Sequence, residues 1–170
     1  VNFMSALASA GTILFLFWTI THFASRLVRN TELEIEPAQW WTVLGAGAVG
    51  ALAYTFSDSF WFSAVEGEVY ALSSFFTALV FWAILKWEQA DERAGNSPAA
   101  RMQSDRWIVL LFFMMGLSIG VHLLNLLTIP AIVMVYYYRR FEVTTKGAIY
   151  AFLIGCAITG IVQVGVIQYS

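Results

Sequence analysis

Long apolar segments separated by short polar connections constrain this sequence more than any other feature. A helix needs about 20 mostly apolar residues to cross the roughly 30 Å hydrocarbon core of a bilayer. Segments that meet this need readily are 3–24, 40–56, 69–85 and 147–167. Apolar residues make up 59% of the chain and charged residues only 12%, whereas soluble domains carry about 25% charged residues. The sequence therefore predicts an all-α membrane protein.

The apolar stretch 107–138 is too long for one ordinary membrane helix. At 1.5 Å per residue its length would be roughly 48 Å, well beyond the hydrocarbon core. Small and polar residues gather at its midpoint: Gly116, Ser118, Gly120, His122 and Asn125. Two helices, 107–120 and 122–138, fit better. We therefore predict a polytopic transmembrane helical bundle of about six membrane helices, with residues 1–170 forming part of a single transmembrane domain.

All nine basic residues fall in alternate connections between these spans. By the positive-inside rule, the face that carries them is cytoplasmic. The longest of these connections, 86–106, is expected to be a mobile cytoplasmic loop without a chemical role. A single helix over 107–138 would have moved three of the nine to the other face, so the charge pattern also favours six helices. The basic residues are Arg26, Arg29, Lys86, Arg93, Arg101, Arg106, Arg139, Arg140 and Lys146.

Three acids, Asp58, Glu66 and Glu68, remain on the outer face, where the predicted loops carry no Lys or Arg. An acid at the centre of a membrane helix costs about 2.5–3.5 kcal/mol, so these acids must face water, a cavity, a metal or a cationic ligand. Glu68 begins an apolar span, and the dipole at a helix N-terminus favours its charged form. On a helix Glu66 and Glu68 would point about 200° apart, so they do not form a chelating pair. Asp58 also suits a helix cap or turn.

His122 and Asn125 are three residues apart and would share one face of a helix. Both side chains donate hydrogen bonds, which suits a lipid phosphate near the outer interface, although polar residues in membrane helices often serve packing alone. The glycine-rich run GAGAVG at 45–50 lies inside an apolar span. We interpret it as small-residue helix packing rather than a dinucleotide-binding loop. The net charge of −2 gives no reason to expect nucleic-acid binding.

The segments FWFSAVEGEVYALSSFFTALVFWAIL and GLSIGVHLLNLLTIPAIVMVYYYRR together resemble a bacterial membrane family related to protein O-mannosyltransferases. The opening VNFMSALASAGTILFLFWTITHFA is similar to the helix that follows the first outer loop of that family. The resemblance implies the GT-C architecture, in a multi-pass protein of the bacterial inner (cytoplasmic) membrane. It also implies transfer of a sugar, possibly mannose, from a polyprenyl-phosphate carrier to Ser or Thr of an acceptor protein on the outer face.

The resemblance also implies roles for particular residues. Glu68, with Glu66 beside it, matches a supporting acid, and His122 and Asn125 stand near the expected carrier phosphate, after Gly116 and Gly120 and before Pro130. Lysine is common at the phosphate position, whereas His122 is positive only when protonated. No cofactor is assigned; a divalent metal would find its candidate ligands in Asp58 and Glu68.

The sequence opens without an initiator Met, and we expect it to be an internal fragment that is inactive alone, with the main catalytic base upstream of Val1. Two other functions stay open. A transporter or channel bundle would use Glu68 and His122 to bind a cation, but it predicts an inverted repeat that the sequence lacks. A non-catalytic scaffold subunit of an envelope complex predicts that neutralising all three outer acids changes only assembly.

Overall fold

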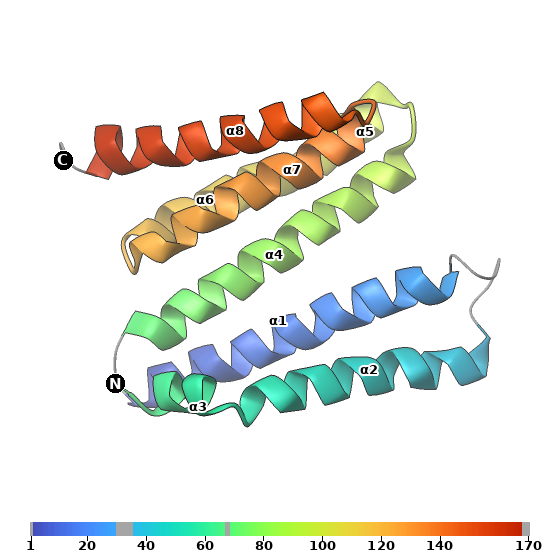
Figure 1. Ribbon diagram of the computed structural model, residues 1–170. Helices are drawn as coiled ribbons and strands as arrows, with labels where there is room; N and C mark the ends of the chain where they lie inside the picture. Colours follow the sequence, from blue (N-terminus) through green and yellow to red (C-terminus); the bar gives the residue numbers. More distant parts are fainter. Residues whose placement is uncertain (1, 30–35, 67–68, 168–170) are drawn as a thin grey trace. The chain divides into compact units, whose positions relative to one another are not determined.

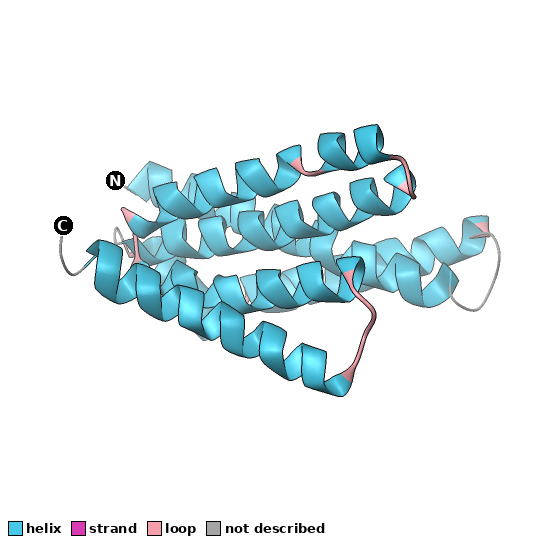
Figure 2. Cartoon of the chain, turned by 90° about the horizontal axis from the view of Figure 1, so that it is seen from above, coloured by secondary structure: helices cyan, strands magenta, loops and turns pink. Residues whose placement is uncertain are grey.

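The computed structural model describes residues 2–29, 36–66 and 69–167, which form helices and short connections without a strand (Figures 1 and 2). The all-α prediction is confirmed. In chain order the elements are α1 (Asn2–Arg29), α2 (Pro37–Thr55), α3 (Asp58–Val65), α4 (Val69–Ala94), α5 (Pro98–Ser104), α6 (Arg106–Ile119), the 3₁₀ turn η1 (Leu123–Leu127), α7 (Thr128–Arg140), α8 (Thr145–Ile161) and the π-helical turn η2 (Val162–Ile167).

Within the described part of the chain, three helices are long and apolar enough to cross a membrane: Phe3–Arg29, Val69–Ala94 and Thr145–Gly165. The stretch 107–138 forms the two helices α6 and α7, with η1 between them. The full set of six membrane spans stays a prediction.

The chain divides into two compact units, Val1–Trp82 and Ala83–Ser170. In the first unit, α1 and α2 lie side by side (Figure 1). Glycines allow this approach, because a Cβ on Gly47 would overlap the Thr21 side chain and one on Gly50 would lie 2.6 Å from Ile20 Cδ1. This packing agrees with the interpretation of the run 45–50 as a helix-packing surface.

Aromatic rings connect α1 to the first half of α4 in the same unit. The Phe15 ring lies 5.7 Å from that of Phe75 and 5.2 Å from that of Trp82, measured between ring centroids. Trp18 adds a second contact with Trp82, at 5.8 Å. Aromatic pairs at these separations contribute about 0.5–1.5 kcal/mol beyond their burial. The first unit therefore contains the first half of α4.

In the second unit, α7 and α8 form an antiparallel pair. A Cβ on Gly155 would lie 2.6 Å from Pro130 Cα, so only glycine allows this contact. At the other end, the Tyr137 hydroxyl donates to the Glu142 carbonyl at 3.0 Å and accepts from the Thr144 backbone N–H at 3.0 Å. These bonds hold the short connection between the two helices.

The expectation of a mobile loop over 86–106 is wrong. Helix α4 continues to Ala94, because the first helix breaker after the apolar segment is Gly95, whose φ of 55° ends the helix in the left-handed conformation. Ser97 then precedes α5 as its N-cap residue, with Pro98 in the first turn. Arg101 Nε donates to the Gly95 carbonyl at 2.8 Å and so ties the turn together.

Candidate functional site

Asp58 and Glu66 lie at the two ends of α3. Asp58 is exposed in the first turn, where the helix dipole favours a negative charge. Glu66 is the partly exposed C-cap residue, and its backbone N–H donates to the Phe62 carbonyl at 3.1 Å. Eight residue steps along α3 separate the two positions by roughly 12 Å along the axis. The two acids are therefore not a carboxylate pair.

Glu68, the acid favoured from the sequence, lies outside the described residues, and α4 begins at Val69. Its helix N-terminal position and its role stay predictions. Over residues 2–29, 36–66 and 69–167, no group of three His, Cys, Asp or Glu side chains is arranged to hold a metal ion. A metal shared by Asp58 and Glu68 also stays a prediction.

His122 and Asn125 lie together in the turn that follows α6. The His122 N–H donates to the Ser118 carbonyl at 2.9 Å, and the Asn125 N–H donates to the His122 carbonyl at 3.4 Å. In a 3₁₀ turn, residues i and i+3 stand on the same side. Asn125 is only 2% exposed, while His122 is partly exposed. His122 is therefore the member of this pair that reaches the surface.

The turn around Asn125 is fixed by hydroxyl groups. The Thr128 hydroxyl, itself buried, donates to the Asn125 carbonyl at 2.7 Å. Ser118, which is 1% exposed, donates to the Met115 carbonyl at 2.7 Å. These bonds give the turn a defined backbone conformation.

The candidate residues belong to different units: Asp58 and Glu66 to the first, His122 and Asn125 to the second. Each pair is positioned by its own unit. A single site that combines the acids with the donors stays a prediction.

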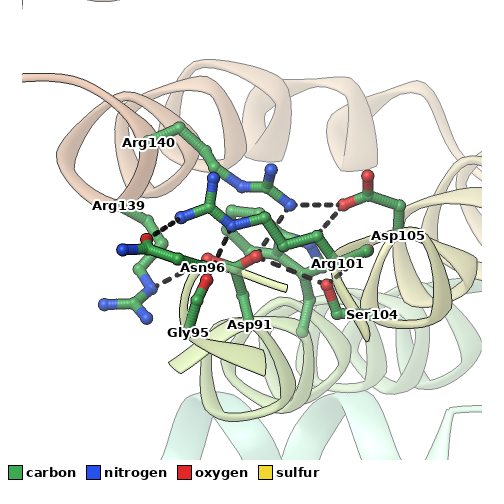
Figure 3. A network of polar contacts seen from close by, with 9 residues as sticks. Asp91, Gly95, Asn96, Arg101, Ser104, Asp105, Arg139 and Arg140 are labelled. Carbon is green, nitrogen blue, oxygen red and sulfur yellow. Dashed lines mark hydrogen bonds and ion pairs between the residues drawn. The ribbon is translucent and has the colours of Figure 1, made fainter. Parts of the chain in front are cut away.

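A cluster of ion pairs in the second unit was not predicted from the sequence (Figure 3). Arg139 Nε lies 3.0 Å from Asp91 Oδ2, and Arg140 Nη2 lies 2.7 Å from Asp91 Oδ1. The same Arg140 nitrogen lies 2.7 Å from Asp105 Oδ1. Only 3% of the Asp91 side chain is exposed. We call these four residues, together with Trp87, the ion-pair cluster.

Trp87 forms the apolar wall of the ion-pair cluster. It is fully buried, and its Nε1–H donates to Asp105 Oδ1 at 3.3 Å. The Arg140 guanidinium lies 5.7 Å from the centre of the Trp87 ring, a cation–π distance. Both oxygens of Asp91 contact a guanidinium, so this carboxylate is not available as a base. The cluster joins α4, α7 and the turn between α5 and α6, and its arrangement indicates a structural role.

The sequence contains a signal from which the helix predicted over 69–85 could have been extended as far as this cluster. The run KWEQADERA at 86–94 consists mostly of good helix formers and ends before a glycine. Asp91 then falls on a helix rather than in a loop. Its pairing with Arg139, 48 residues later, has no local signal.

Basic residues gather at one end of each unit. In the first unit, Arg26 and Arg29 lie in the last turn of α1, while α3 with its acids follows the far end of α2. In the second unit, the end with the ion-pair cluster carries the basic residues, and the turn with His122 follows the opposite end of α6. The basic residues of the second unit are Lys86, Arg93, Arg101, Arg106, Arg139, Arg140 and Lys146.

Comparison with known protein families identifies the family of this chain. Residues 1–145 match the family described as the protein O-mannosyl-transferase TMEM260 N-terminal domain. The match covers most of the 170 residues, so the chain belongs to this family. The relation to protein O-mannosyltransferases expected from the sequence is confirmed at this level. Neither a curated protein nor a solved structure matches the chain significantly.

Proposed function

We propose that this chain is part of a GT-C membrane glycosyltransferase that moves mannose from a polyprenyl-phosphate carrier to a Ser or Thr hydroxyl of an acceptor protein. The observation that carries this proposal is the family match over residues 1–145. A lipid-linked donor requires an enzyme embedded in the bilayer. The three helices of membrane-spanning length and composition support that setting.

The reaction has two chemical needs. A carboxylate must accept the proton of the attacking hydroxyl, and hydrogen-bond donors must stabilise the charge on the departing carrier phosphate. We assign Glu66 and Glu68 as supporting acids for the first need, and His122 and Asn125 to the carrier phosphate. Because Asn125 is buried, its amide would act from inside the protein, and the partly exposed His122 would make the outer contact.

The distribution of charge within each unit supports an orientation. The described basic residues lie at one end of each unit, and the acids of α3 and the turn with His122 lie at the other. By the positive-inside rule the basic ends face the cytoplasm. The reaction would then take place on the outer face of a bacterial cytoplasmic membrane.

The test is Glu68→Gln in the full-length protein, measured as mannose transferred to an acceptor protein from synthetic polyprenyl-phosphate mannose. We expect at least about a tenfold loss of rate, equivalent to about 1.4 kcal/mol in the barrier, with unchanged membrane insertion. Glu142→Gln is the matched control, because Glu142 is an exposed acid that belongs to none of the candidate sites. Wild-type transfer by Glu68→Gln would remove Glu68 from the mechanism. Wild-type transfer after neutralising Asp58, Glu66 and Glu68 together would favour a scaffold.

A further inference from the structure

Helix α3 has one buried face and one exposed apolar face. Phe60 is 5% exposed, and its ring lies 4.7 Å from that of Tyr54 in α2. On the other side, Trp61, Phe62 and Val65 are 56%, 63% and 56% exposed. At 100° per residue, these three side chains fall within an arc of about 100°. Packing against α2 therefore buries the face of α3 that carries Phe60. The opposite face, with Trp61, Phe62 and Val65, has no described partner.

The composition of this exposed face narrows what can cover it. The eight residues DSFWFSAV contain no Lys or Arg, so α3 has no charge that would attract an anionic surface or an acidic partner. Trp and Phe are the residues that favour the boundary between lipid headgroups and acyl chains, because their rings are apolar or amphipathic and rigid. The polar residues Asp58 and Ser59 are exposed at the beginning of the helix.

The position of α3 in the first unit agrees with such a boundary. It follows α2 at the end of the α1–α2 pair that is opposite to Arg26 and Arg29, and it packs on both helices. After residues 67–68 the chain enters α4, which is long and apolar enough to cross a membrane. A short helix next to the end of a membrane span lies at the level where the bilayer meets water.

We propose that α3 is an interfacial helix that lies along the outer membrane surface, with Trp61, Phe62 and Val65 inserted at the headgroup boundary. Its partner is the lipid bilayer. Glu66, which follows α3 directly, is then held at headgroup level, the depth of a lipid-linked phosphate. The membrane contact itself is independent of the proposed catalytic activity.

The test uses full-length protein in lipid nanodiscs, with single cysteines introduced for spin labelling. Because Cys156 is exposed, it is replaced by serine, as is any cysteine outside residues 1–170. The labelled variants are Trp61→Cys, Phe62→Cys and Val65→Cys, with Ser59→Cys as the matched control on the same helix. Collision rates are measured with oxygen, which concentrates in lipid, and with a water-soluble nickel chelate.

We expect the oxygen-to-nickel collision ratio at the three apolar positions to exceed that at Ser59 several-fold. Equally low ratios at all four positions would show that α3 lies in water, and equally high ratios would show that the whole helix lies within lipid; either result would overturn the proposal. Low collision rates with both reagents at Trp61, Phe62 and Val65 would show that protein covers the face, which would also overturn it. No sugar transfer is measured, so failure of the proposed enzymatic function leaves this result unaffected.

Discussion

The carboxylates of the two units differ in what surrounds them. In the second unit, Asp91 is almost completely buried and contacts two arginines. In the first unit, Asp58 and Glu66 make no ion pair with any residue that the structure describes, and Asp58 is exposed. A carboxylate whose oxygens are both bound stabilises a fold, whereas an unbound one remains available to a ligand. Asp91 is thus a structural acid, whereas Asp58 and Glu66 stay candidate functional acids.

Replacing Asp91 is expected to have the largest effect. Asp91→Ala leaves Arg139 without its described ion pair and Arg140 with only Asp105. Removing one partner of a buried pair costs about 3–5 kcal/mol, because the remaining charge stays desolvated. The free energy of unfolding in lipid–detergent mixtures checks this value. Asp58→Ala is the control, and its loss should stay below about 1 kcal/mol. Equal decreases in the free energy of unfolding for Asp91→Ala and Asp58→Ala would contradict the distinction between a structural and an available carboxylate.

A smaller loss is expected from Arg140→Lys, which keeps the charge of the ion-pair cluster. One guanidinium nitrogen of Arg140 contacts both Asp91 and Asp105 while the planar group lies over the Trp87 ring, and a lysine ammonium cannot keep this planar contact with the ring. We expect a decrease of about 1–2 kcal/mol in the free energy of unfolding. Arg139→Lys should cost less, because Arg139 is more exposed and has one described ion pair. An Arg139→Lys loss larger than that of Arg140→Lys would contradict this ranking, because Arg140 contacts two aspartates and Arg139 one.

Asp105→Asn tests the exposed side of the same cluster. Because 45% of the Asp105 side chain is exposed, its pair with Arg140 should contribute only about 0–1 kcal/mol. The asparagine oxygen can still accept from Trp87, so the substitution isolates the charge. The wild-type advantage should shrink as salt is added, since salt screens exposed charges. An effect as large as that of Asp91→Ala, and independent of salt, would show that Asp105 is also effectively buried.

The smallest change in stability is expected for Glu66→Gln. With no ion pair in the described part of the chain, this substitution should change the free energy of unfolding by less than about 0.5 kcal/mol. If Glu66 is a supporting acid, mannose transfer by the full-length protein should fall by up to about tenfold, or about 1.4 kcal/mol. Lower stability with normal transfer would place Glu66 among the structural acids.

Fold class could be predicted from the sequence, because the lengths of apolar segments are local properties. Short elements could not be predicted in the same way. The eight residues of α3 lie in a connection, and a search for membrane-length segments passes over them. The span predicted as 69–85 ended at the first charge, whereas α4 continues for nine more residues to Ala94. Hydropathy indicates where a helix can lie in lipid and not where its hydrogen bonding ends.

For the candidate sites, local sequence identified isolated polar residues but not long-range pairs. His122 and Asn125 could be found together because they are three residues apart in one turn. Asp91 was assigned to a loop, since nothing near it in sequence indicates that Arg139 and Arg140 neutralise it. The polar residues next to Asp91 in the sequence suggested that it is exposed. In the folded chain its side chain is buried, because residues distant in sequence cover it.

The order of synthesis along the chain determines when the ion-pair cluster can form. Asp91 is made 48 residues before Arg139, and ribosomes add roughly 5–20 residues per second. For roughly 2–10 s, therefore, the carboxylate exists without its arginine partners. During this interval it must stay hydrated, which keeps the end of α4 out of the lipid core. Arrival of α7 then allows Asp91 to become buried, so closure of the cluster marks the point at which these helices of the nascent chain can dock.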